Sequence, residues 1–163
     1  MPELVDIVHY AHVMGATVLL GTGAGIAFFM LLAHRTQDAK LIAHVSGTVV
    51  IADTVFTATA AIFQPVTGAF LAVYHGWPFL EGWVLASILL YLFVGLFWIP
   101  VIFIQIKMRN LARIAAEAGE VLPNPYHRLF RIWFIFGFPA FFAMLAIFWL
   151  MLFKPDVPIV LFG

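Results

Sequence analysis

His12 lies inside the first long apolar stretch of the chain, with His9 three residues before it. Ionisable side chains are costly to place within a membrane segment, and those that occur there tend to mark ion pathways, proton relays or cofactor ligands. We therefore consider haem or metal ligation by His12 first, with His9 as a neighbouring candidate. The alternative for a single histidine at this depth is a hydrogen bond within the protein.

The composition indicates the elements that must position these histidines. The 163 residues are 64% hydrophobic and 10% charged, with a mean hydropathy of +1.08, values typical of a chain that spans a bilayer. Four apolar stretches each exceed the roughly 20 residues that a spanning helix needs. We predict an all-α integral membrane four-helix up-and-down bundle, a single transmembrane domain over residues 1–163 with helices at about 5–33, 41–73, 82–109 and 127–153.

The basic residues predict the orientation of this bundle. They are concentrated in or beside the first and third connections: Arg35, Lys40, Lys107, Arg109, Arg113, Arg128 and Arg131. Connections rich in Lys and Arg stay in the cytoplasm, so both termini are expected outside, which in a bacterium means an inner membrane protein with periplasmic termini. Glu3 and Asp6 stand where a cleavable signal peptide would carry basic residues, so this segment is expected to stay in the mature protein.

The absence of cysteine from the sequence limits the chemistry. It excludes disulfides, thiolate-bound iron–sulfur or zinc sites, c-type haem attachment and thiol catalysis. Histidine, methionine, tyrosine and carboxylate side chains remain as ligands, so any redox chemistry would come from a cofactor. The lipid bilayer is the expected surrounding, and no nucleic acid partner is expected.

The second apolar stretch carries polar residues at helical spacing. Ser46, Asp53, Thr57, Gln64 and Gly68 are separated by four or seven residues, so they share one side of a helix. Asp53 is expected to face the bundle, either in a hydrogen-bonded contact between helices or as a proton relay or ion site. Gln64 precedes Pro65, which predicts a kink and a carbonyl freed one turn earlier.

The third stretch has a weaker polar face. Its members are Ser87, Tyr91, Gly95, Trp98 and Gln105. We group Tyr91 with Asp53 and Gln64 as a candidate polar core or proton relay. Four tryptophans near predicted helix ends fit an interfacial aromatic belt: Trp77, Trp83, Trp133 and Trp149.

The first stretch contains small residues at four-residue spacing. Thr17, Gly21 and Gly25 predict a face on which a neighbouring helix packs closely. The functional alternative is clearance for a flat macrocycle. Gly15 and Gly23 lie nearby, and small residues at this spacing favour the packing interpretation.

The histidines divide by depth. His9 and His12 lie toward the outer side, whereas His34 and His44, which are candidate cofactor ligands as well, lie at the inner boundary. A second helix or loop would supply any second haem ligand to His12, with His75 and Met151 as candidates by depth, or the iron would be five-coordinate. Arg128 and Arg131 either anchor the last helix to lipid phosphates or grip the propionates of a haem on the inner side.

Two segments carry a resemblance to known proteins. HVMGATVLLGTGAGIAFFMLLAH (His12 to His34) and YHRLFRIWFIFGFPAFFAMLAIFWLMLFKP (Tyr126 to Pro155) resemble a family of small uncharacterised bacterial integral membrane proteins. More distantly they are similar to HemJ-type protoporphyrinogen oxidases and to the copper-resistance CopD membrane domain. The HemJ-type pattern matches His12, His34, Arg131, Pro139 and the Lys154-Pro155 pair, and implies a scaffold that binds haem b. The chain departs from that pattern in residues 82–106, which lack histidine and lysine.

Two classes of function follow from these observations. The first is a membrane protein that binds haem b through His12 and acts in electron transfer or oxidoreduction, with a redox partner or a second copy of the chain. The second is a protein without haem: a small transporter, a copper-handling module, or a structural subunit of a membrane complex. A dedicated metal permease would be expected to show a His-rich or Met-rich motif, which the sequence lacks.

Overall fold

The computed structural model describes residues 3–158. The elements follow in the order α1 (Leu4–Thr36), α2 (Ala39–Ala52), the π-helix η1 (Asp53–Thr57), α3 (Ala58–His75), α4 (Gly82–Ala118) and α5 (Asn124–Phe153). Because α2, η1 and α3 continue one another, the described residues form four helices long and apolar enough to cross a membrane. No strand occurs in this part of the chain. The predicted all-α four-helix membrane bundle is confirmed.

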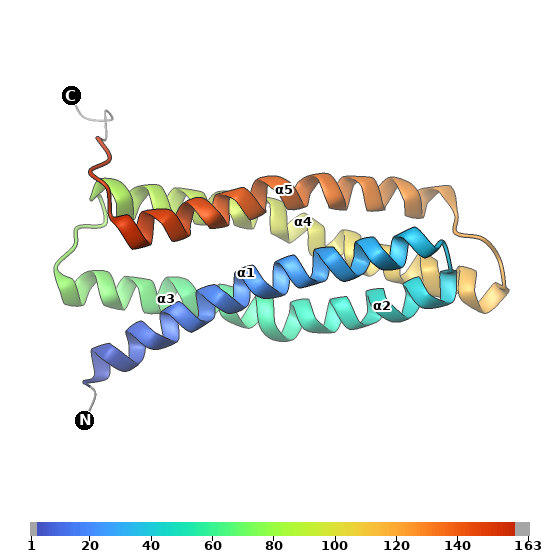
Figure 1. Ribbon diagram of the computed structural model, residues 1–163, viewed down its shortest axis with the longest axis horizontal. Coiled ribbons are helices and arrows are strands. Elements are labelled where there is room, and N and C mark those ends of the chain that lie inside the picture. The colour runs from blue at the N-terminus through green and yellow to red at the C-terminus, as the bar shows by residue number, and fades with distance from the viewer. Residues whose placement is uncertain (1–2, 159–163) are drawn as a thin grey trace.

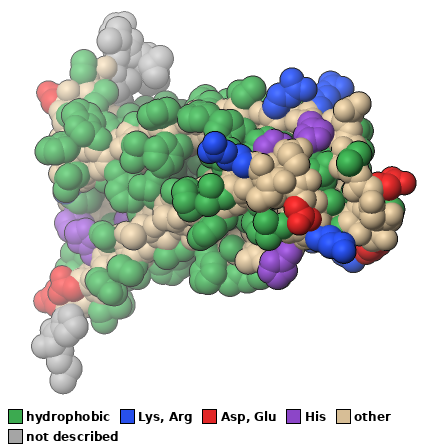
Figure 2. Space-filling model, turned by 45° about the vertical axis from the view of Figure 1, so that its right-hand side comes forward, with side chains coloured by type: hydrophobic (Ala, Val, Ile, Leu, Met, Phe, Trp, Pro, Cys, Tyr) green, Lys and Arg blue, Asp and Glu red, His purple; other side chains and the backbone are tan. Residues whose placement is uncertain are grey.

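The helices run up and down, so connections alternate between two ends of the bundle (Figure 1). The α1–α2 and α4–α5 connections meet at one end, which we call the basic end. The α3–α4 connection lies with the two chain termini at the other end, the terminal end. The Lys and Arg side chains visible in Figure 2 lie toward the basic end. Basic residues that are far apart in sequence thus lie toward the same end of the bundle.

Local signals in the sequence explain where the helices begin and end. The Asp38 side chain accepts from the backbone nitrogen of Lys40 at 2.8 Å and so caps the start of α2. Gly76 and Gly119 follow α3 and α4 with φ values of 71° and 67°. Glycine adopts this left-handed conformation without the clash that a Cβ would cause, so both positions stop their helices.

Side chains pack most tightly in the basic half of the bundle. Tyr126, Met30, Ile42 and Met108 are almost fully buried there, between α1, α2, α4 and α5. The imidazole of His34 stacks on the ring of Phe130, with centroids 3.6 Å apart and planes at 8°. This half holds the largest hydrophobic cluster of the described residues and fixes the helices relative to one another.

The helices separate toward the middle of the bundle. There α1 packs on α2 and α3, and α5 packs mainly on α4. A Cβ added at Gly21 or Gly25 of α1 would meet no described atom within 4 Å outside its own helix. The predicted close packing is therefore wrong at Gly21 and Gly25, and Thr17 is exposed. Small residues permit two helices to approach, but a neighbouring helix must also come into contact with them, and none of the described helices does so at these two glycines.

The terminal end is closed by contacts between the α3–α4 connection and the chain after α5. The Lys154 ammonium lies 4.0 Å from the ring centroid of Trp77, and Trp83 packs with Val157 in a small apolar cluster. A Cβ at Gly82 would collide with the Val157 backbone, so glycine is required where this segment crosses the start of α4.

Candidate functional site

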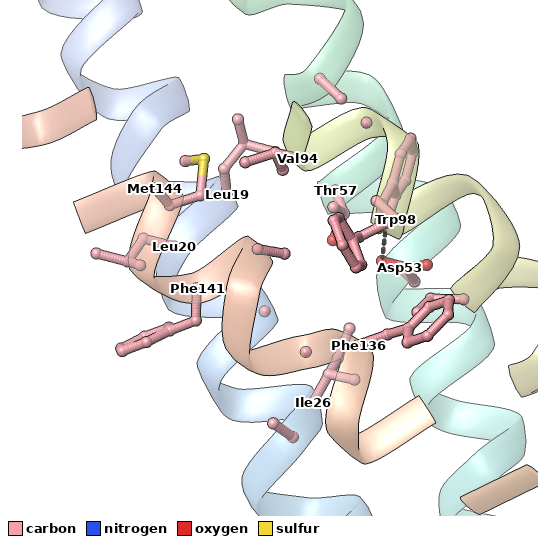
Figure 3. A pocket seen from close by; sticks show the side chains of 18 of the residues that line it. Leu19, Leu20, Ile26, Asp53, Thr57, Val94, Trp98, Phe136, Phe141 and Met144 are labelled. Carbon is pink, nitrogen blue, oxygen red and sulfur yellow. Dashed lines mark hydrogen bonds between the residues drawn. The ribbon is translucent and has the colours of Figure 1, made fainter. Parts of the chain in front are cut away.

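A cavity of about 560 Å³ lies between the helices, near the middle of the four apolar stretches. α1, η1, α3, α4 and α5 all contribute to its wall (Figure 3). Most of this wall is apolar, formed by side chains such as Leu19, Val94, Phe136 and Met144. Volumes of about 300–1,000 Å³ with apolar walls and a few polar groups are typical of small-molecule sites.

Glycines on three helices enlarge this cavity. Gly23 of α1, Gly95 of α4 and Gly137 of α5 line it, and a Cβ at any of them would meet no described atom within 4 Å outside its own helix. Larger side chains at these positions would project into free volume. Gly23 and Gly137 are also exposed, so the cavity opens to the surface between α1 and α5.

Asp53 is the acidic residue of this cavity wall, and its side chain is buried, with 6% of the residue exposed. It begins the π-helix η1, in which the backbone nitrogen of Ala58 donates to the carbonyl of Asp53, five residues earlier. The wider turn keeps Asp53 and Thr57 on the same buried side. The indole Nε1 of Trp98 on α4 donates to Oδ1 of Asp53 at 3.2 Å.

Gln105 extends this contact to α5. With its amide oriented to satisfy its neighbours, Nε2 of Gln105 donates to Oδ2 of Asp53 at 3.2 Å, and its oxygen accepts from Nε1 of Trp133 at 3.1 Å. Trp133 is buried rather than interfacial, so its assignment to the aromatic belt is wrong. We call Asp53, Trp98, Gln105 and Trp133 the carboxylate network; it links η1, α4 and α5.

Thr57 adds an unused hydroxyl to the same wall. The residue is 7% exposed, and its Oγ1 has no hydrogen-bond partner within residues 3–158. Buried hydroxyls are nearly always paired, because an unpaired one forfeits its hydrogen bonds to water. Thr57 lines the cavity beside Asp53, and its oxygen can accept a hydrogen bond from a molecule held there.

The proline of α3 explains how Tyr91 is held. Pro65 has no N–H and therefore leaves the Ala61 carbonyl, four residues earlier, without its helical donor. The hydroxyl of Tyr91 on α4 donates to this carbonyl. Tyr91 thus joins α3 to α4 across the edge of the cavity, and its proton is engaged by the backbone. The structure brings Tyr91 and Asp53 to one cavity, whereas Gln64 lies elsewhere.

Gln64 lies with His12 at the contact between α1 and α3. Its Nε2 donates to the His12 carbonyl at 2.7 Å. Nδ1 of His12 is 2.8 Å from Oγ1 of Thr67, which donates its own proton to the Phe63 carbonyl at 2.9 Å. With the Thr67 proton directed at the Phe63 carbonyl, the assigned tautomer has the proton on Nδ1, which donates to Thr67, and leaves Nε2 of His12 with its lone pair. A Cβ at Gly68 would lie 3.2 Å from the imidazole, so glycine admits the ring against α3.

The remaining predicted site residues are separated from the cavity. His9, His44, Arg128 and Arg131 are exposed. Nδ1 of His34 lies 3.4 Å from the Tyr126 hydroxyl in the basic half. None of these histidines and arginines, nor His12, lines the cavity, and no group of three or more metal-ligating His, Asp or Glu side chains occurs among residues 3–158.

Sequence reasoning placed Trp98 and Gln105 on one face of the third helix but did not connect them with Asp53. Their spacing of seven residues was the available signal. Trp133 gave no such signal, because a tryptophan near a helix end is also typical of a membrane interface.

The chain matches a known family of proteins. No curated protein and no solved structure matches the chain. The model of the family described as "Predicted integral membrane protein (DUF2269)" matches residues 6–155, nearly the whole chain. This match confirms the resemblance to a family of integral membrane proteins and is consistent with the four spanning helices. The protein therefore belongs to the DUF2269 family of integral membrane proteins.

Proposed function

We propose that this membrane protein binds a lipophilic small molecule in the cavity between its helices. The observation that carries this proposal is the cavity itself, with about 560 Å³ of free volume and glycines from three helices facing it. Side chains that only packed the bundle would fill such a space, because voids in a core forfeit contacts. The opening between α1 and α5 lies on the surface that lipid chains would cover, so the ligand enters from the bilayer.

Fluorescence from a pyrene probe tests this proposal. Binding of 1-pyrenemethanol to the purified protein in a non-ionic detergent is followed by energy transfer from tryptophan, since Trp98 lies on the cavity wall. Gly95→Leu and Gly137→Leu place side chains in the free volume and are expected to weaken binding at least about tenfold.

Gly21→Leu is the matched control. Gly21 also faces open space on a helix but does not line the cavity, so this variant is expected to bind the probe as the wild type does. Equal affinities for all four proteins would contradict binding in the cavity.

A second candidate function is haem binding through His12, in an electron-transfer or oxidoreductase role with a redox partner. One observation favours it. Thr67 holds the Nδ1 proton of His12 and leaves Nε2 with a lone pair, which is the arrangement that haem and metal ligands adopt. The donor chemistry of His12 therefore fits an axial ligand. The cavity wall does not fit a histidine-ligated haem, because none of its described residues is a histidine.

The two ends of the bundle support an orientation with both termini outside the cytoplasm, in the inner membrane if the source is a bacterium. The basic end joins the halves of α1, α2, α4 and α5 that carry all Lys and Arg residues of the sequence except Lys154. Reporter fusions are expected to place residues 37–38 and 119–123 in the cytoplasm and residues 76–81 outside. A cytoplasmic reporter signal after the end of α5 would contradict this orientation.

A further inference from the structure

We infer that the ligand of this cavity is a lipophilic amine, held as its ammonium ion by Asp53. The inference rests on the proposed binding function and adds the chemical class of the ligand. Four observations support it: the hydrogen bonds to Asp53, the charges of the cavity wall, its aromatic side chains, and the free hydroxyl of Thr57.

The hydrogen bonds to Asp53 suit a negatively charged carboxylate. Each of its two oxygens accepts an N–H bond, one from Trp98 and one from Gln105, both at 3.2 Å. Donors directed at both oxygens stabilise the ionised group more than the protonated one. Both donors are neutral, so they stabilise the charge without cancelling it.

A positive charge that pairs with an ionised Asp53 would have to come from outside the cavity wall. None of the described residues that line the cavity is Lys, Arg or His. A charged group at the centre of a membrane protein is costly unless it is paired. A cationic ligand would supply the partner, and the carboxylate would fix the position of its charged nitrogen.

The rest of the wall fits the remaining parts of such a ligand. Aromatic rings including Tyr91, Phe97, Trp98 and Phe136 line the cavity, and ring faces attract cations as well as apolar groups. The free Oγ1 of Thr57 can accept a second N–H bond from the ammonium group, one turn of the π-helix from Asp53.

A matched pair of probes tests the charge of the ligand. 1-Pyrenemethylamine is an ammonium ion at neutral pH, and 1-pyrenemethanol is its neutral counterpart of similar shape. The wild-type protein is expected to bind the ammonium probe at least roughly tenfold more tightly, the effect of a close buried charge pair. Asp53→Asn is expected to abolish this preference but to retain affinity for 1-pyrenemethanol. Binding of this alcohol by the variant would show that its cavity is intact.

Thr54→Val is the control variant. Thr54 belongs to η1 but is exposed, and its hydroxyl bonds to the Val50 carbonyl, so the preference for the ammonium probe should persist. Equal affinity of the wild type for the two probes would overturn the amine assignment, and this comparison does not require Asp53→Asn to fold. If the two affinities are equal but Gly95→Leu loses affinity for both probes, the cavity would still be supported as the binding site. Binding of both probes unaffected by Gly95→Leu would overturn the cavity and the amine together.

Discussion

Asp53→Asn is expected to lower the free energy of unfolding by about 1–3 kcal/mol, although the two side chains have nearly the same shape. Asp53 accepts hydrogen bonds at both oxygens, from Trp98 and from Gln105. Asparagine offers one acceptor, so its NH₂ group would face the NH₂ group of Gln105. Rotating the Gln105 amide would not help, because its NH₂ group would then face the indole N–H of Trp133. One pair of donors thus stays unmatched in a buried site.

The double variant Asp53→Asn, Gln105→Glu is expected to recover this loss. Asparagine at 53 would accept from Trp98 and donate to the new carboxylate, which would also accept from Trp133. The free energies of unfolding of the wild type, the two single variants and the double variant are measured in detergent by circular dichroism. Gln105→Glu alone should destabilise the protein, because two carboxylates would then adjoin one another. A double variant whose loss of unfolding free energy equals or exceeds the sum of the two single losses would show that the carboxylate network contributes little.

If the protein binds haem through His12, the second function proposed above, His12→Ala is expected to remove or strongly shift the Soret absorption of protein purified from cells supplied with haem. Alanine takes away the lone pair of Nε2, which Thr67 leaves available for iron. His9→Ala should keep the absorption, because His9 is exposed and points about 60° away on the helix.

Thr67→Val separates ligation from packing. It preserves the shape of the side chain but removes the acceptor for the Nδ1 proton of His12. Loss of such an outer partner typically lowers metal affinity about 10–100-fold, and haem titration measures this change. Wild-type protein without a Soret band would exclude the haem role. A spectrum that responds to His34 or His44 instead of His12 would move the haem to the basic end.

Periodicity and composition were sufficient to predict the four helices. Unbroken apolar stretches leave the backbone no partner in lipid other than its own helix, so their length alone predicts spanning helices. The polar spacing around Asp53 likewise predicted a buried face, since a charged residue avoids lipid. Pro65 predicted a free carbonyl, and the structure gives its partner, Tyr91.

The partners of these groups depend on tertiary structure. Helical spacing predicts which side of a helix a residue occupies, but it does not predict which other helix packs against that side. Gly21 and Gly25 thus had the spacing of a packing face, yet they face open space. His12 had the depth of a cofactor ligand, yet its ring lies against α3 and outside the cavity.

The amino-acid sequence by itself determined that this protein is a four-helix membrane bundle with a buried carboxyl group at its centre. These properties follow from interactions of each residue with its own helix and with lipid, which local sequence sets. The tertiary structure alone decided that Asp53 meets Trp98 and Gln105, that Thr57 is left with a free hydroxyl, and that glycines of three helices face one cavity. These contacts depend on how helices that are distant in sequence are rotated and separated. Small differences in side-chain packing determine that rotation and separation.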